Sequence, residues 1–258
     1  MTETADAGRG AEIRAALARV RGRVARAALR VGRDPAEVCL VGVGKGFAVP
    51  DLEQAVAVGL ADLGENRVQE ALPKVAALPG VRWHLIGQLQ RNKARAVVGR
   101  FALIHSVDRP ELAESLARAA EDARRTQDVL VQVNVLSRPG QGGVPPQDAE
   151  ALVIRIRDLG PLRVRGLMTI APLVEDPEAV RMVFRSLRVL RDRLQVRLGV
   201  VLPELSMGMS GDLEAAVEEG ATLVRVGRAI FGARPAGPGG PGLRKEPLPL
   251  DRNDNIER

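Results

Sequence analysis

The sequence predicts a single (β/α)8 TIM-type barrel with an extra helix ahead of the first strand. Short runs rich in Val, Leu and Ile alternate with helix-length segments about eight times, as such a barrel requires. The 258 residues also suit one barrel of this kind. Aromatic residues make up 2% of the chain, so the core must be aliphatic, which suits strands buried on both faces. A doubly wound open sheet fits less well, because no GxGxxG motif follows the first strand run.

The elements are expected in a regular order. Apolar residues recur at helical spacing among arginines from Ala11 to Arg30, which indicates the extra helix. Further helices are expected over 52–59 and 213–219, the latter opening after a glycine-rich turn. Strands are expected over 38–44, 63–66, 83–87, 103–107, 129–135, 164–170, 204–207 and 223–227.

Both ends of the chain read differently from the barrel. Residues 1–9 are polar and are expected to form a flexible N-terminus. Residues 235–258 begin with a Pro/Gly-rich stretch and are expected to form a disordered tail. The barrel should therefore occupy residues 10–234, with no second domain.

Composition excludes several classes of function. No secretory signal or membrane-spanning apolar run is visible, and the single Cys39 lies in a strand-like run, which favours a cytoplasmic protein. The net charge of +6 comes from scattered arginines, and with no Tyr and few Phe a specific nucleic-acid site is not expected. Two histidines and one cysteine without ligand spacing argue against a metal site.

Two glycine-rich turns follow the last two predicted strands. The first runs over Ser206–Asp212, and the second contains Gly227. Barrels of this class place active sites at the carboxyl ends of the strands, often with a phosphate site after strands seven and eight. Glycines let the backbone approach an anion closely, and hydroxyl and N–H groups supply donors. A phosphate monoester site is one interpretation; helix capping and tight turns alone are the other.

Lys45 is the lysine best placed for covalent chemistry. It follows the apolar strand ending at Gly44, where partial desolvation would lower the pKa of its amine and favour attack on a carbonyl. Lys74 and Lys93 are expected on polar helix faces, and Lys245 lies in the tail. A P-loop is excluded, because no Ser or Thr follows Lys45.

His84 and His105 both fall inside predicted strands. Each is therefore expected to be a core histidine with its ring nitrogens hydrogen-bonded. His105 and Asp108 are too close in sequence to belong to a hydrolase triad, and no GxSxG nucleophile elbow is present.

The sequence resembles the pyridoxal phosphate homeostasis protein family, whose barrel is similar to the N-terminal domain of alanine racemase. The resemblance runs from Ala11 to Arg234 and includes many motifs in order. These are Val43–Lys45, Gly64–Glu70, His84–Lys93, His105–Arg109, Arg165–Met168, Leu205–Ser210 and Val224–Gly232.

This resemblance implies a pyridoxal 5′-phosphate (PLP) site. It implies an internal aldimine on Lys45, a phosphate held by Ser206 and the backbone around Gly227 and Arg228, and Arg225 facing the pyridine nitrogen. Asn66 and His84 would lie around the ring. The implied cofactor-binding set is Lys45, Asn66, His84, Ser206, Met207, Gly208, Arg225, Gly227 and Arg228, with no catalytic residue and no metal ligand.

Three positions depart from the pattern of the family. Gly44 stands where Ser is usual before the lysine, and Arg228 stands where Thr is usual. Gln141 replaces a lysine that usually precedes a Gly-Ile pair. These departures bear on the affinity for phosphate and on the role of the loop around Gln141.

The implied function is a carrier or buffer of PLP in vitamin B6 and amino-acid homeostasis, without turnover. Arg225 hardly gives up a proton, so the pyridine would stay a poor electron sink. The chain also lacks the tyrosine that a two-base racemase needs. PLP-dependent apoenzymes are the expected recipients, and the protein is expected to be a monomer. A PLP-dependent racemase or lyase is the main alternative. A cofactor-free barrel aldolase and an interaction module are further ones.

Overall fold

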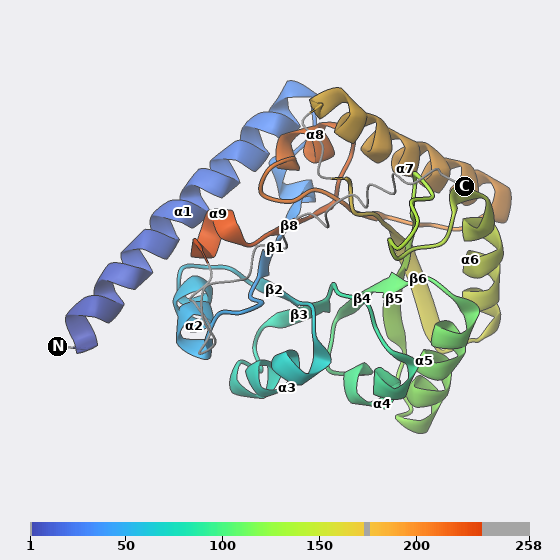
Figure 1. Ribbon diagram of the computed structural model, residues 1–258, viewed down its shortest axis with the longest axis horizontal. Helices are drawn as coiled ribbons and strands as arrows, with labels where there is room; N and C mark the ends of the chain where they lie inside the picture. Colours follow the sequence, from blue (N-terminus) through green and yellow to red (C-terminus); the bar gives the residue numbers. More distant parts are fainter. Residues whose placement is uncertain (1, 173–175, 234–258) are drawn as a thin grey trace, which may run out of the picture.

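The computed structural model describes residues 2–172 and 176–233, and its centre is a closed barrel of eight parallel strands (Figure 1). Each strand pairs with the next in sequence, and β8 pairs back onto β1, where Val41 lies opposite Arg225. The strands are β1 (Cys39–Val43), β2 (Asp62–Glu65), β3 (Arg82–Leu85), β4 (Leu103–Val107), β5 (Gln127–Gln132), β6 (Leu162–Met168), β7 (Glu204–Ser206) and β8 (Leu223–Val226). The predicted (β/α)8 barrel is confirmed, with each strand within a few residues of its expected place.

Helices surround the barrel and connect successive strands (Figure 1). The α-helices are α1 (Thr2–Arg30), α2 (Val49–Ala57), α3 (Val68–Ala77), α4 (Ala94–Val97), α5 (Pro110–Asp122), α6 (Ala149–Asp158), α7 (Pro177–Leu198), α8 (Leu213–Glu218) and α9 (Arg228–Phe231). Short 3₁₀ turns are η1 (Pro35–Glu37), η2 (Arg91–Lys93) and η3 (Pro146–Asp148).

Alternation along the strands separates two cores. Outward-facing side chains such as Leu63, Trp83 and Leu85 pack under the helices in one large cluster. Inward-facing side chains form a small apolar cluster of Val41, Leu103, Leu130, Met168 and Leu223 inside the barrel. Burial on both sides explains why the strands read as aliphatic runs.

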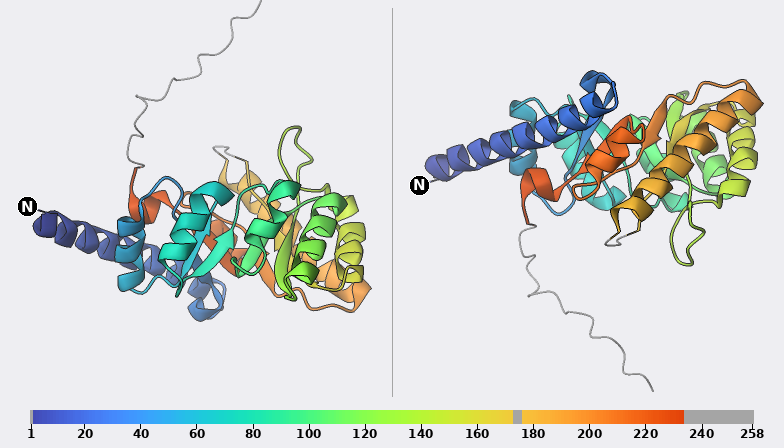
Figure 2. Two further views of the ribbon diagram at one scale, coloured as in Figure 1. Left: turned by 90° about the horizontal axis from the view of Figure 1, so that it is seen from below. Right: turned by 90° about the horizontal axis from the view of Figure 1, so that it is seen from above.

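The extra N-terminal helix, α1, packs against α2, α8 and α9. Its buried stripe includes Ile13, Leu17, Val20 and Val24, which recur at helical spacing. Figure 2 shows its N-terminal end projecting beyond the rest of the molecule.

Residues 2–9, part of the segment expected to form a flexible N-terminus, belong to α1, and their flexibility stays a prediction. The Arg9 guanidinium, near the end of that segment, donates hydrogen bonds to Asp51 and to the Phe231 carbonyl. Residues 2–9 show no apolar residues at helical spacing, so the sequence does not indicate that the helix begins at Thr2. The tail expected over 235–258 lies outside the described residues.

In the described ranges, no helix combines the length and the apolar character that a bilayer crossing demands.

Candidate functional site

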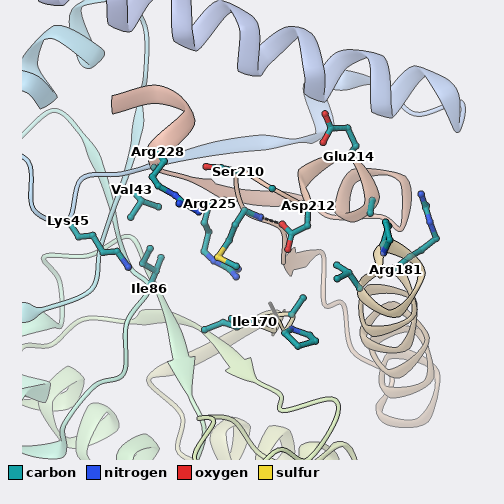
Figure 3. A pocket seen from close by; sticks show the side chains of 18 of the residues that line it. Val43, Lys45, Ile86, Ile170, Arg181, Ser210, Asp212, Glu214, Arg225 and Arg228 are labelled. Carbon is teal, nitrogen blue, oxygen red and sulfur yellow. Dashed lines mark hydrogen bonds between the residues drawn. The ribbon is translucent and has the colours of Figure 1, made fainter. Parts of the chain in front are cut away.

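A cavity of about 1100 Å³ opens at the carboxyl ends of the strands (Figure 3). Its walls come from the residues after β1, β2, β3, β6, β7 and β8, together with parts of α1, α7 and α8. Barrels of this class carry their active sites at this end. The volume is ample for a cofactor-sized molecule.

Lys45 lines the cavity two residues after the end of β1. The strand places it there because the Gly44 N–H donates to the Gly64 carbonyl and Phe47 N–H closes a turn onto the Gly44 carbonyl. The side chain is partly buried and points into the cavity, toward the side where Arg225 and Arg228 lie (Figure 3).

The loop between β7 and α8 forms the next wall. Gly208 has φ +91°, a conformation that favours glycine, and its carbonyl accepts a hydrogen bond from the Arg225 N–H. Ser210 and Asp212 line the cavity. The Asp212 carboxylate accepts from the Met209 N–H, and burial raises the pKa of Asp212.

The turn after β8 contributes Gly227 and Arg228 to the same wall. The Ala229 N–H lies 3.4 Å from Ser210 Oγ, so the two glycine-rich turns meet here. The Arg228 side chain is exposed at the cavity. Within residues 2–172 and 176–233 it forms no hydrogen bond or ion pair, which leaves its guanidinium available to an anion.

Arg225 forms the floor of the cavity and is 5% exposed. Its guanidinium donates to Ser206 Oγ at 2.6 Å and to the Thr169 carbonyl at 2.9 Å. Burial lowers the pKa of Arg225 to about 10, with Asp212 opposing the shift, so the group remains charged at neutral pH.

The structure brings together five of the predicted site residues. Lys45, Asn66, Arg225, Gly227 and Arg228 all line the cavity.

The other four predicted residues lie behind the cavity wall. Ser206, Met207 and His84 are fully buried and do not line the cavity, and Gly208 acts through its backbone. The Ser206 hydroxyl is turned into the barrel, toward His105 and Arg225. Ser210, four residues later in the same glycine-rich segment, is the hydroxyl at the cavity.

Both histidines are core residues with both ring nitrogens hydrogen-bonded, as their strand positions predict. His84 contacts Asp62 and His105, and His105 also contacts Ser206. Burial, together with the charge of Arg225, lowers the pKa of His105 well below its ordinary value. His105 is therefore neutral at physiological pH.

Lys74 differs from its predicted place on a polar helix face. It is buried between α3 and the barrel, where its Nζ donates to Glu65 Oε1 at 2.6 Å and to the Gly44 carbonyl at 2.9 Å. Glu65 Oε2 is buried without a hydrogen-bond partner in the described part of the chain. A signal was present, because Lys74 follows the buried Val68 and Ala71 at helical spacing.

The far end of the cavity carries charges that the sequence analysis did not identify. Arg30 of α1 and Arg181 of α7 both pair with Glu218 of α8, at 3.0 Å and 2.7 Å. Figure 3 shows Arg181 at this end, away from Lys45. These residues come from three helices distant in sequence, so no local motif marks them.

Gln141, which stands where the family usually has a lysine, lies on the loop after β5. Its side-chain amide donates to the Ile170 carbonyl, and Ile170 lines the cavity. The loop is thereby fastened to the cavity wall by a neutral group. Among the described residues, no cluster of His, Cys, Asp or Glu is suited to a metal ion.

Comparison with known proteins gives a consistent result. The alanine racemase N-terminal domain family matches residues 17–235. The pyridoxal phosphate homeostasis protein of Aquifex aeolicus is 45% identical over 220 residues, 84% of this chain and 96% of that protein. The one from Pseudomonas aeruginosa is 43% identical over 223 residues, 86% of this chain and 95% of that protein.

A solved structure agrees with these sequence relatives. PipY of Synechococcus elongatus PCC7942, with PLP bound, is 40% identical and superposes with a TM-score of 0.73 over 83% of this chain and 100% of that one. The chain therefore belongs to the pyridoxal phosphate homeostasis protein family, built on the alanine racemase N-terminal domain.

Proposed function

We propose that this protein holds PLP as a Schiff base on Lys45 and acts in PLP and amino-acid homeostasis without turnover. The observation that carries the proposal is the position of Lys45 in a cavity that also contains Arg225, Arg228 and Ser210. A primary amine and a cationic, hydroxyl-lined wall are the two features that a phosphorylated aldehyde needs. PLP supplies the aldehyde for that bond.

Each residue at the cavity has a proposed part. Ser210, the backbone of Gly227 and the side chain of Arg228 hold the phosphate, and Asn66 lies beside the ring. Arg225 faces the ring nitrogen. Because its guanidinium stays charged, it donates a hydrogen bond there but does not readily deliver a proton. This favours storage over carbanion chemistry.

The site is tested by absorbance, reduction and peptide mapping. Purified protein with added PLP should show a yellow band that borohydride removes, with a pyridoxyl group on the Lys45 peptide. Lys45→Ala should abolish both, and Lys93→Ala, which removes a lysine outside the cavity, should change neither. A protein that takes up no PLP, or a label that persists in Lys45→Ala, would contradict the site.

The role is tested separately in cells of the source organism. Deleting the gene should change free PLP and amino-acid pools, and the wild-type gene should restore them while the Lys45→Ala gene should not. Unchanged pools would contradict a homeostatic role. Transfer to PLP-dependent apoenzymes is part of this proposal, and mixing loaded protein with such an apoenzyme should restore its activity.

The PLP-dependent racemase or lyase remains the alternative. Loaded protein is incubated with a panel of L- and D-amino acids, and racemised or cleaved products are measured by chiral chromatography. Turnover that depends on Lys45 would replace the carrier with an enzyme. No product above the level of free PLP is the outcome that we expect.

A further inference from the structure

A continuous line of hydrogen bonds crosses the inside of the barrel and ends at the cavity floor. Asp62 Oδ1 lies 2.8 Å from His84 Nε2, and His84 Nδ1 lies 3.0 Å from His105 Nε2. His105 Nδ1 lies 2.8 Å from Ser206 Oγ, which also accepts from Arg225 at 2.6 Å. All five residues are buried and come from five different strands. They are called the polar relay below.

The two ends of the polar relay determine its direction. Arginine can only donate hydrogen bonds, and an ionised carboxylate can only accept them. Ser206 therefore accepts from Arg225, and His105 Nδ1 is the one other partner of its hydroxyl among the described residues. The Ser206 hydroxyl then donates its hydrogen to His105 Nδ1, because that hydrogen would otherwise be buried without an acceptor. Each histidine is then neutral, with its proton on Nε2.

The far end of the relay supports an ionised Asp62. Burial raises its pKa, but the hydrogen bond from His84 and the charge of Arg82 outweigh burial, so the pKa lies below its ordinary value. The Arg82 guanidinium lies 3.5 Å from Asp62. A carboxylate at this end is thus the acceptor that the direction of the relay requires.

Arg225 has other partners besides the relay, so the relay is not needed merely to compensate its buried charge. The Thr169 carbonyl already accepts one of its N–H groups, and Asp212 lies close enough to favour its charge. Apolar packing is often at least as stable as a buried polar network of similar volume. The relay instead restricts the plane of the guanidinium, because two of its N–H groups are held by acceptors in separate segments, Ser206 in β7 and Thr169 just after β6.

We propose that Asp62, His84, His105 and Ser206 are positioning residues, which hold the Arg225 guanidinium so that its remaining N–H groups face an acceptor on the bound ligand. This inference rests on the proposed function, in which that acceptor is an unprotonated ring nitrogen. The relay also directs its hydrogens away from the cavity. It can deliver no proton to the ligand unless both histidines exchange tautomers.

The first test uses the protein without PLP. The chain has 2 histidines, so ¹⁵N-histidine labelling gives four ring-nitrogen signals. Both Nε2 atoms should show the shift of a protonated nitrogen and both Nδ1 atoms that of a bare one. A doubly protonated ring, or a proton on His105 Nδ1, would overturn the direction of the relay.

The second test compares two variants that each remove one buried hydroxyl. Ser206→Ala cuts the relay at Arg225. Ser106→Ala is the control, because it removes a hydroxyl that is equally buried and bonded to the Gly87 carbonyl, outside both the relay and the cavity wall. The readout without PLP is a slowly exchanging guanidinium signal, assigned to Arg225 by its absence in Arg225→Lys. This signal should be lost in Ser206→Ala and kept in Ser106→Ala. Equal behaviour of the two variants would overturn the positioning role.

The same variants are then titrated with PLP. Ser206→Ala should weaken PLP binding about tenfold, the effect of one hydrogen bond to a charged group, and should shift the absorbance maximum of the complex. Ser106→Ala should do neither. If wild-type protein binds no PLP, the proposed function fails. The direction of the relay and its effect on Arg225 are still tested by the two measurements made without PLP. Ser206→Cys, of similar size, replaces Ser206→Ala if that variant does not fold.

Discussion

Arg228 gives this cavity a cation that the usual threonine of the family would not supply. Its side chain lines the cavity beside Gly227 and is exposed there. A guanidinium can form two parallel hydrogen bonds to a phosphate, which a hydroxyl cannot do. In the proposed complex, the departure from the family pattern adds a contact with phosphate while keeping the backbone N–H.

The first prediction follows from this contact. Arg228→Thr should weaken PLP binding about tenfold, the worth of a charge-assisted hydrogen bond, and should reduce the salt dependence of the dissociation constant. Arg19→Thr, at an exposed position on α1, is the matched control and should change neither. Equal affinity of Arg228→Thr and wild type, measured by fluorescence titration, would show that the side chain does not touch the phosphate.

Glu65 and Lys74 permit a second prediction at the residue scale. Burial raises the pKa of Glu65, while the hydrogen bond and charge of Lys74 act in the opposite direction. Lys74→Met should cost about 3–5 kcal/mol at neutral pH, because it leaves a buried charge without a partner. The double variant Glu65→Gln with Lys74→Met should recover most of that loss.

The pH dependence of Lys74→Met follows from linkage. A carboxyl whose pKa is higher in the folded state loses stability as pH rises from its ordinary value of 4.5 through the folded value. Removing Lys74 raises the folded value further, so the deficit of Lys74→Met should grow with pH above 4.5. Urea unfolding across this range measures it, and a deficit independent of pH would contradict the buried charge.

At the scale of single residues, the sequence predicts a position in the cavity where the local pattern alone determines it. Lys45 follows an apolar strand, and the barrel then places it at the cavity. The burial of Lys74 is not predicted if its charge alone is considered, because a lysine is normally exposed. Its position on the buried stripe of α3 indicates the opposite. The contact of Ser206 with His105 spans 101 positions in the chain, and no local pattern encodes which inward-facing side chains meet across a barrel.

At the scale of elements, the loop between β7 and α8 depends on one glycine. A Cβ on Gly208 would lie 2.5 Å from the Ala216 Cβ, and its φ of +91° strains any other residue. A Cβ on Gly211 in the same loop would meet nothing within 4 Å. Gly208 is therefore required by the backbone conformation and the packing of the loop, whereas Gly211 is not, although both belong to one motif.

The third prediction uses this difference. Gly208→Ala should lower the free energy of unfolding by about 2–4 kcal/mol through strain and crowding, and should weaken PLP binding because Ser210 moves with the loop. Gly211→Ala should stay within about 0.5 kcal/mol of wild type. Denaturant titrations of both variants decide it, and similar losses in the two would contradict the account.

Elements were predicted well where periodicity was strong. The strand over Leu103–Val107 has the expected bounds, and all five of its residues are buried. Residues 2–9 carry no apolar periodicity in the sequence, so no pattern predicts that α1 begins at Thr2.

At the scale of the whole molecule, α1 packs against α8, and both helices contribute residues to the cavity wall. Arg23 of α1 binds Glu214 of α8 at 2.6 Å, and Arg33, just past the helix, donates to the Val217 and Ala221 carbonyls. Arg30 reaches the cavity itself. The helix ahead of the first strand thus contributes to the wall of the candidate site.

The fourth prediction tests this coupling. Leu17→Ala should destabilise the protein by about 2–5 kcal/mol, because Leu17 is 1% exposed under α1. It should also weaken PLP binding, since α8 loses its support. Arg19→Ala, on the exposed face of the same helix, should change neither property. Thermal unfolding and PLP titration measure both, and a stability loss with unchanged affinity would separate α1 from the site.

The burial of Lys74 also bears on side reactions. A free aldehyde condenses with any accessible amine, whereas the guanidinium of arginine stays protonated and is a poor nucleophile. The chain carries 38 basic side chains, and those of the described ranges are nearly all arginine. The Lys74 ammonium is buried in an ion pair with Glu65. Among the described residues, Lys93 is then the other lysine whose amine can compete with Lys45 for the aldehyde. Over that surface, an aldehyde carrier of this composition would suffer little adventitious modification, and its cargo would be directed to one amine.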